Sequence, residues 1–437
     1  MSQKTKSTIK KSTHISIIFS LIMFILIVVA SFLNISFSPP KVDIQETHEA
    51  KAAGESWYAN SGTWNYRKKI TIDRTKVADV TNPSITYANF PLLVSITGLS
   101  NVNANGSDIR FTMANGITEI PREIESYDSG NLEAWVKLTL TKDAGDITND
   151  VIYMYYGNSS ATEPLASSEF GKDNVWSNTG AVGIWLFNET EGDYAYDSSS
   201  YGSDFASCTG RWGEGGLMFT GDTISLDAST IQKQLGITDE MSVIIKLNVT
   251  SEHPDFYETF ISMETQPFFI RRYSNSSYQG RVATISESTY VSNNIALAGL
   301  NEHHIITFTA ESGAQRLYVN GNDKESALIT GELGVSPSNL IIGDIIGNID
   351  YIHIYNIARS AEWVLTEYNN RNNDSLFLAF TTETSLPCAG QGGMCKADTC
   401  SIYVDCAPLL GACGTSNCCS GTCTDDTVSP TIPANLS

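Results

Sequence analysis

The sequence has few basic residues, and this shortage limits what the protein can bind. Its 437 residues include 27 Lys and Arg but 48 Asp and Glu, which gives a formal net charge of −21. A nucleic-acid backbone is bound by clustered Lys and Arg, so we expect no nucleic-acid partner. An acidic surface suits a soluble extracellular protein and also supplies carboxylates for calcium.

The motifs of several enzyme classes are also missing. The sequence contains no G-x-S-x-G nucleophile motif, no P-loop and no H-E-x-x-H helix. These are the local arrangements that serine hydrolases, phosphate-binding NTPases and zinc proteases need for their chemistry. A binding protein is therefore favoured over an enzyme.

Cysteine is scarce until the C-terminal tenth of the chain, where it becomes dense. Outside the cell such a density indicates disulfides, because so small a segment cannot bury enough apolar surface by itself. We expect a knottin-like module over residues 386–424, although eight cysteines allow 105 pairings and the sequence does not choose among them. Zinc is the weaker interpretation, because no Cys-x2-Cys pair or nearby His supports it. Cys208 is expected to be buried and free, and the predicted disulfide cysteines are Cys388, Cys395, Cys400, Cys406, Cys413, Cys418, Cys419 and Cys423.

The N-terminus has the pattern of a targeting segment. Four lysines within the first eleven residues precede an apolar run from Ile15 to about Phe37. Positive charge before a hydrophobic stretch directs the rest of the chain across a membrane. The run approaches the ~20 residues that span a bilayer, which favours an uncleaved signal anchor over a cleaved signal peptide within residues 1–38. The bulk of the chain is expected at the cell surface or secreted.

Composition and hydrophobic periodicity divide the rest of the chain into segments. Residues 39–56 are polar and are expected to form a stalk, and residues 161–179 to form a connector. Two β domains are predicted at 57–160 and 180–383, so the fold class is all-β. Residues 425–437 are Pro- and Ser-rich and are expected to be a linker, which leaves open a further domain beyond them.

The first β domain shows six short segments with alternating apolar and polar residues, separated by turn clusters. This pattern predicts a β-sandwich. Trp64–Asp73, Asp108–Phe111, Ala134–Val136 and Tyr153–Asn158 together resemble an exported family known as domain of unknown function 2341. The resemblance implies no activity.

The second β domain carries three segments with a two-residue period: Gly183–Glu189, Arg316–Gly321 and Asn348–Ala358. In this order and spacing they resemble the laminin-G-like, concanavalin-A-type jelly roll. A helix capped by Ser360 is expected after the last of them, followed by a terminal strand over Leu376–Thr381. The resemblance implies a jelly roll and a binding role.

A calcium site is implied by the same resemblance. Members of that family often hold a structural Ca²⁺ through acids on the loops next to the first and last strands, which here are Glu189, Asp197 and Asp350. Tyr351 stands where the family commonly has a second acid. The alternative interpretation is that these carboxylates cap turns by accepting backbone N–H groups.

Glycan binding is predicted from exposed aromatic residues, because the resemblance implies binding but no particular ligand. Aromatic rings can stack on sugars while polar neighbours bond the hydroxyl groups. Trp185 and Trp363 are expected in the core. The candidate ligand-binding residues are Trp212, Phe256, Tyr257, Arg271, Tyr273, Tyr278 and Tyr290.

Three functions follow from these observations. The favoured one is a cell-surface protein that binds a polysaccharide or glycoprotein and is held to the membrane by its N-terminal segment. The second is a carbohydrate-active enzyme, although the E-x-D-x-x-E string of laminarinase-like enzymes is absent and Glu252-x-x-Asp255-x-x-Glu258 has a different spacing. The third is a structural spacer.

Overall fold

The computed structural model describes the two β domains and short parts of the C-terminal region. The predicted signal anchor and stalk lie outside the described residues. Within the described chain, no helix has the length and hydropathy needed to cross a bilayer. The described residues are 57–60, 62–77, 86–141, 151–213, 215–227, 240–252, 257–263, 268–273, 277–283, 288–293, 300–329, 339–372, 377–385, 408–413 and 416–419.

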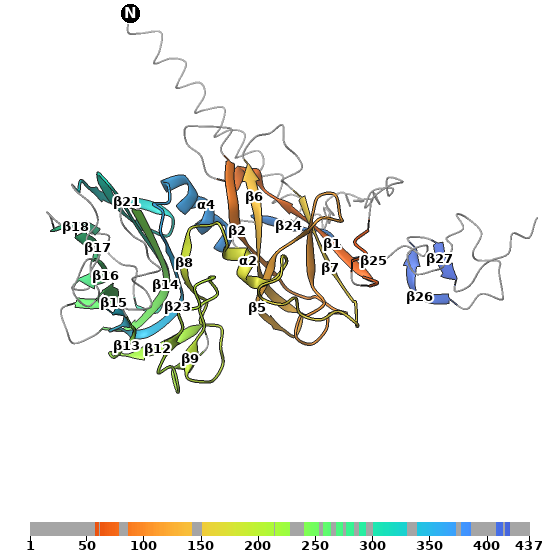
Figure 1. Ribbon diagram of the computed structural model, residues 1–437, viewed down its shortest axis with the longest axis horizontal. Helices are drawn as coiled ribbons and strands as arrows, with labels where there is room; N and C mark the ends of the chain where they lie inside the picture. Colours follow the sequence, from red (N-terminus) through yellow and green to blue (C-terminus); the bar gives the residue numbers. More distant parts are fainter. Residues whose placement is uncertain are drawn as a thin grey trace, which may run out of the picture. The chain divides into compact units, whose positions relative to one another are not determined.

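The first β domain is a two-sheet sandwich, as its sequence predicts (Figure 1). One sheet has the order β24-β1-β7-β3-β4, where β24 is Leu378–Phe380, and β25 (Thr384–Ser385) also pairs with β1; the other sheet has the order β2-β6-β5. Apolar residues at alternate positions of both sheets fill the core between them. The elements are β1 (Tyr66–Ile72), η1 (Arg74–Lys76), β2 (Thr86–Ile96), β3 (Arg110–Met113), β4 (Glu119–Ile120), β5 (Arg122–Asp128), β6 (Asn131–Thr141) and β7 (Val151–Tyr156).

The second β domain is also built from two antiparallel sheets over one apolar core. The larger sheet has the order β11-β12-β23-β14-β19-β20-β21, and β8 pairs with β23; the smaller has the order β13-β22-β15-β16-β17-β18. Its elements are β8 (Ala181–Trp185), β9 (Tyr194–Ala195), β10 (Phe205–Ala206), β11 (Trp212–Gly213), β12 (Gly216–Thr220), β13 (Thr223–Leu226), β14 (Glu240–Ser251), β15 (Tyr257–Met263), β16 (Phe268–Tyr273), β17 (Ser277–Ala283), β18 (Ser288–Asn293), β19 (His303–Glu311), β20 (Ala314–Val319), β21 (Asn322–Ala327), β22 (Leu340–Gly343) and β23 (Ile346–Tyr355).

Several local predictions are confirmed. Trp185 and Trp363 are buried, and Cys208 is a buried free thiol. The helix α4 (Ala361–Arg371) begins after Ser360, whose hydroxyl accepts a hydrogen bond from the Trp363 backbone N–H. That bond satisfies one of the donors that every helix start leaves open.

The expected terminal strand forms, but in the other domain. It is β24 (Leu378–Phe380), and it pairs antiparallel with β1 at Ile72↔Leu378 through Ile70↔Phe380. The next strand, β25 (Thr384–Ser385), also pairs with β1. The assignment of this strand to the second domain was wrong, because a two-residue period identifies a strand but not its partner. The chain therefore closes the first domain's sheet only after the second domain is complete.

The apolar core of the first β domain continues onto residues of the second. The connector carries α2 (Lys172–Trp176), and Trp176 packs 5.3 Å from Trp135 of β6, measured between ring centroids. Tyr355 of β23 and Trp363 of α4 belong to the same buried cluster as the first sandwich. The described residues of the two β domains thus pack against each other rather than forming two separate modules.

The predicted cysteine-rich module lies almost wholly outside the described residues. Within it, only the backbones of β26 (Pro408–Cys413) and β27 (Ser416–Cys419) are described, and they pair antiparallel. The predicted disulfides stay a prediction.

Candidate functional site

The loop after β8 displays a group of exposed tyrosines. Its short strands β9 and β10 pair through Ala195 and Phe205, both of which are buried in the second domain's core. Because neighbouring strand residues point to opposite faces, Tyr194 and Tyr196 point outward on either side of Ala195. They are 49% and 55% exposed, and their ring centroids lie 6.4 Å apart with planes 24° from parallel. We call these two rings the tyrosine platform.

Asp197 fixes the loop that carries the tyrosine platform. One carboxylate oxygen accepts the backbone N–H groups of Ile184 and Ser199, each at 2.8 Å. The other accepts the Ser203 N–H at 2.9 Å and the Ser199 hydroxyl at 2.7 Å. Burial raises the pKa of Asp197 and the backbone bonds lower it, with burial the larger effect. Four donors on one buried carboxylate make Asp197 a structural anchor, as the turn-capping interpretation expected.

The other two predicted metal ligands are also engaged. Oε1 of Glu189 accepts the Tyr196 N–H at 2.8 Å. Asp350 forms an ion pair with Lys246 at 2.7 Å and lies 3.1 Å from His303 Nδ1. Nowhere in the part of the chain that the structure describes do three His, Cys, Asp or Glu side chains gather as a metal ligand set. The three acids are therefore not brought together, and calcium binding stays a prediction.

Trp212 belongs to the base of the tyrosine loop. Its indole Nε1 donates to the Gly192 carbonyl at 2.9 Å, and its ring is half-buried against the core. The Asp193 carboxylate beside this turn accepts from the Thr209 hydroxyl at 2.8 Å, and these bonds lower the pKa of Asp193. Trp212 thus stabilises the loop, and only part of its ring is accessible to a ligand.

The aromatic residues predicted on the smaller sheet are only partly available. Tyr257 is 40% exposed, but the Arg271 guanidinium lies 3.8 Å above its ring and covers one face. Tyr278 is 2% exposed and packs on Phe260, so the structure corrects its assignment as a ligand-binding residue. The remaining candidates, Phe256 and the side chains of Tyr273 and Tyr290, lie outside what the structure describes.

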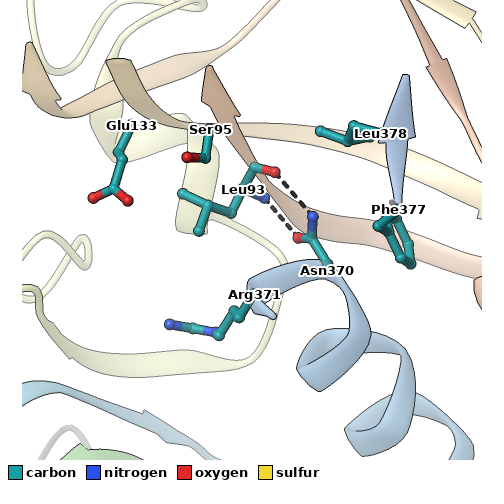
Figure 2. A pocket seen from close by; sticks show the side chains of 7 residues that line it. All are labelled: Leu93, Ser95, Glu133, Asn370, Arg371, Phe377 and Leu378. Carbon is teal, nitrogen blue, oxygen red and sulfur yellow. Dashed lines mark hydrogen bonds between the residues drawn. The ribbon is translucent and has the colours of Figure 1, made fainter. Parts of the chain in front are cut away.

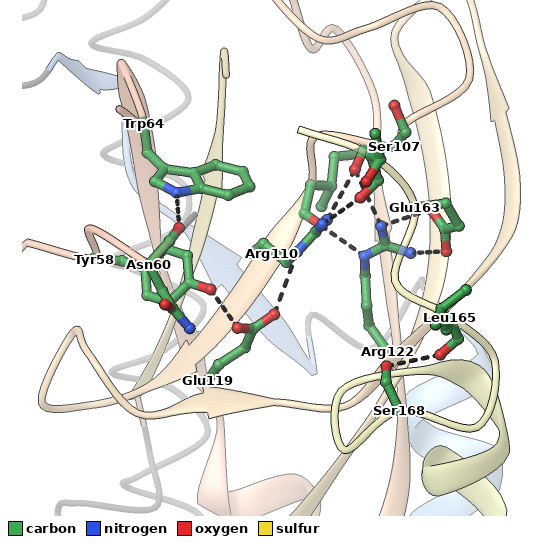
Figure 3. A network of polar contacts seen from close by, with 12 residues as sticks. Tyr58, Asn60, Trp64, Ser107, Arg110, Glu119, Arg122, Glu163, Leu165 and Ser168 are labelled. Atoms are coloured by element: carbon green, nitrogen blue, oxygen red, sulfur yellow. Dashed lines mark hydrogen bonds and ion pairs between the residues drawn. The ribbon is translucent and has the colours of Figure 1, made fainter. Parts of the chain in front are cut away.

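Two buried arginines organise the first domain (Figure 3). Arg122 holds both oxygens of Glu163, at 2.6 and 2.7 Å, and its Nε donates to the Ile109 carbonyl at 2.6 Å. Arg110 donates to the Thr162 carbonyl at 2.6 Å and pairs with Glu119 at 3.3 Å. These bonds tie the start of the connector to β3 and β5. We interpret the network as structural, because each arginine is ion-paired with a glutamate of the same network.

A second polar network lies where the two domains meet. Glu123 of β5 accepts the Trp176 indole N–H at 2.6 Å and the Ser198 hydroxyl from the tyrosine loop. Burial raises the pKa of Glu123 to about 7. Glu125 accepts the Trp135 indole N–H at 2.6 Å, and burial followed by the charge of Glu133 raises its pKa to about 7 as well.

Arg371 of α4 occupies the middle of this junction. Its guanidinium lies 3.8 Å from the ring centre of Tyr351 and 4.6 Å from that of Trp135. Nε pairs with Glu367, and Nη2 lies 2.9 Å from His353 Nδ1. Burial lowers the pKa of His353 well below its usual value, and the charge of Arg371 acts in the same direction. His353 is therefore a neutral acceptor here, and the Arg371 guanidinium contacts it, Glu367 and two aromatic rings at the junction.

A small pocket opens beside Arg371 (Figure 2). Its volume is about 120 Å³, and it lies between β2, β6, α4 and the start of β24. No sequence pattern predicts this pocket, because it exists only where β24 returns to the first domain. Its lining residues are Leu93, Ser95, Glu133, Asn370, Arg371, Phe377 and Leu378.

Comparison with protein families gives one match. Residues 105–195 match the family described as "Domain of unknown function (DUF2341)", which confirms that part of the resemblance seen in the sequence. The match runs past the first sandwich through α2 and β8 to Ala195, and so covers the connector that the structure packs against β5 and β6. No curated protein matches the chain.

Solved structures show only a distant likeness. The botulinum neurotoxin serotype D binding domain has 15% identity and a TM-score of 0.36, over 44% of this chain and 52% of that one. A Trypanosoma rangeli sialidase in complex with 2,3-difluorosialic acid has 10% identity and a TM-score of 0.36, over 57% of this chain and 44% of that one. This chain thus matches about half the length of each, and at these scores the likeness carries no argument about function.

Proposed function

We propose that the chain is an exported cell-surface protein that binds glycans through the tyrosine platform of its second β domain. The observation that supports this most is the pair of exposed rings, Tyr194 and Tyr196, on a loop fixed by the buried Asp197. Flat, exposed rings on a fixed loop suit the C–H faces of sugar rings, because little ordering is required when the ligand binds. A protein that acts only as a spacer would not need two exposed aromatic rings on a fixed loop.

The charges around the platform favour an uncharged glycan. Glu191, Asp193 and Asp204 lie on the same loop, while its nearest basic residue in sequence, Arg211, is paired with Asp222. A sulfated or uronic polysaccharide would meet these acids, and like charges at an interface oppose binding. We therefore expect neutral sugars, whose hydroxyl groups can donate to the carboxylates.

Export to the cell surface is part of the proposal. It rests on the lysines and the apolar run of residues 1–37 and on the cysteine density after residue 387. Anchoring by the N-terminal segment would place the glycan-binding domain beyond the stalk of residues 39–56. Fluorescence microscopy of the full chain with a C-terminal tag tests this, because surface labelling of intact cells is expected and purely internal labelling would contradict it.

A glycan panel tests the binding. The full chain is applied to neutral, uronic and sulfated polysaccharides, with and without a calcium chelator. Binding to at least one neutral polysaccharide is expected, and a chelator effect would identify calcium as a cofactor. Tyr194→Ala and Tyr196→Ala should each weaken the interaction about tenfold, because each ring can lose roughly 50 Å² of exposed surface to a sugar face, worth about 1.3 kcal/mol. No binding to any neutral member of the panel would contradict the proposal.

A further inference from the structure

The pocket between the two β domains has polar groups whose bonding capacity is unused. Ser95 and Glu133 face each other across β2 and β6, so their side chains lie on the same side of that sheet. Within the described residues, neither the Ser95 hydroxyl nor the Glu133 carboxylate has a hydrogen-bonding partner. Arg371 uses Nε for Glu367 and Nη2 for His353, which leaves its Nη1 without a bond in the same part of the chain.

The fourth polar residue of the pocket is already occupied. The Asn370 amide accepts the Leu93 backbone N–H at 2.7 Å and donates to the Leu93 carbonyl at 2.9 Å (Figure 2). The Asn370 amide thereby makes the two bonds that a neighbouring strand would make to Leu93 at the edge of β2, and it ties α4 to that strand. These two bonds tie the α4 side of the pocket to β2, and a pre-formed site lowers the ordering cost of a ligand.

The pocket presents three kinds of surface. Glu133 supplies a negative charge, and Arg371, whose charge is paired with Glu367, supplies an N–H donor at Nη1. Leu93, Phe377 and Leu378 supply apolar surface. A ligand with only an anion would be repelled by Glu133, and one with only a cation would leave the Arg371 Nη1 donor without a partner. A ligand that carries both charges and an apolar group matches all three.

We propose that this pocket binds a free zwitterionic α-amino acid with an apolar side chain. Its ammonium group pairs with Glu133, and its carboxylate accepts from Arg371 Nη1 and the Ser95 hydroxyl. The side chain lies on Leu93, Phe377 and Leu378. The size agrees, because about 120 Å³ is room for roughly four waters at about 30 Å³ each, and so for a small amino acid such as leucine whose charged end lies at the exposed Glu133. The proposal is independent of glycan binding at the tyrosine platform.

Isothermal titration of the full chain tests this directly. The probes are L-leucine, isopentylamine, which lacks the carboxylate, and isocaproate, which lacks the ammonium group. Leucine is expected to bind, and each analogue should bind at least about tenfold more weakly, because each loses a charge-assisted contact. The comparison of ligands probes Arg371 without replacing it, since Arg371 also holds the junction together.

Variants locate the binding. Glu133→Gln and Ser95→Ala change partly exposed positions and should weaken leucine binding, by about tenfold for Glu133→Gln and less for Ser95→Ala. Glu311→Gln makes the same change at an exposed position of β19 and should leave the affinity for leucine as it is. Equal binding of the three probes, equal affinity of wild type and Glu133→Gln, or no binding up to about 10 mM leucine would each overturn the proposal.

Discussion

Replacing Asp197 by alanine removes the carboxylate on which the tyrosine loop depends. The side chain accepts from three backbone N–H groups and one hydroxyl, and all four donors lie on buried residues. A hydrogen bond to a charged group contributes about 1.5–3 kcal/mol, and contributions within one network are not additive. We therefore expect a loss of about 4 kcal/mol in the local stability of the loop. Asp197→Asn keeps one acceptor oxygen and should lose about half as much.

Hydrogen exchange followed by mass spectrometry measures this loss where it occurs. Peptides that cover residues 181–206 should exchange faster in Asp197→Ala by about three orders of magnitude, which corresponds to 4 kcal/mol. Peptides from the first domain's β2 and β6 serve as the internal reference and should change little. Unchanged exchange in the loop would refute the reasoning. Chelator treatment of the wild type distinguishes the calcium hypothesis, because it should have no effect if Asp197 acts through backbone bonds alone.

Three further predictions concern the junction and the second domain's sheet. Glu123 has a folded pKa of about 7 against an ordinary value of 4.5, so the folded state holds its proton more tightly. As the pH rises from 4.5 to 7, Glu123 should therefore lower the stability to urea by about 3 kcal/mol. Glu123→Gln should remove that part of the pH dependence and leave the part that comes from Glu125. Asn370→Ala should cost about 1–3 kcal/mol and lower the melting temperature, since it leaves a backbone N–H and a carbonyl of β2 without their partner; an unchanged melting temperature would contradict this. Gly216→Ala should prevent correct folding, because a Cβ there would lie 2.2 Å from a backbone oxygen of β23. Gly192 also has a positive φ, but nothing lies within 4 Å of a Cβ built there, so Gly192→Ala should cost only about 1–2 kcal/mol in the same urea titration.

Local elements of this fold could be predicted from the sequence. The two-residue period identified the strands of the first sandwich, and Ser360 marked the start of α4. Such patterns report which face of an element is buried, and burial follows directly from residue type. They could not show that β24 pairs with β1, because that pairing joins residues more than 300 positions apart and leaves no local signal.

The candidate site was predictable only in part. The sequence Asp193-Tyr-Ala-Tyr-Asp197 already contains the alternation that turns Ala195 inward and the two tyrosines outward, so the platform had a detectable signal. The role of Asp197 had none, since a carboxylate can hold either a metal ion or backbone N–H groups and only the folded loop decides between them. The burial of Glu123 likewise depends on Trp176 and Ser198, which arrive from the connector and the second domain.

Glycan recognition by the tyrosine platform is tested most directly by one comparison of affinities. Isothermal titration with fragments of the neutral polysaccharide that binds best is performed on the wild type, on Tyr194→Ala/Tyr196→Ala and on Tyr257→Ala. The double variant is expected to lose at least about tenfold in affinity, whereas Tyr257→Ala, whose ring is covered on one face by Arg271, should bind as the wild type does. Full affinity in the double variant, or a loss confined to Tyr257→Ala, would contradict the account.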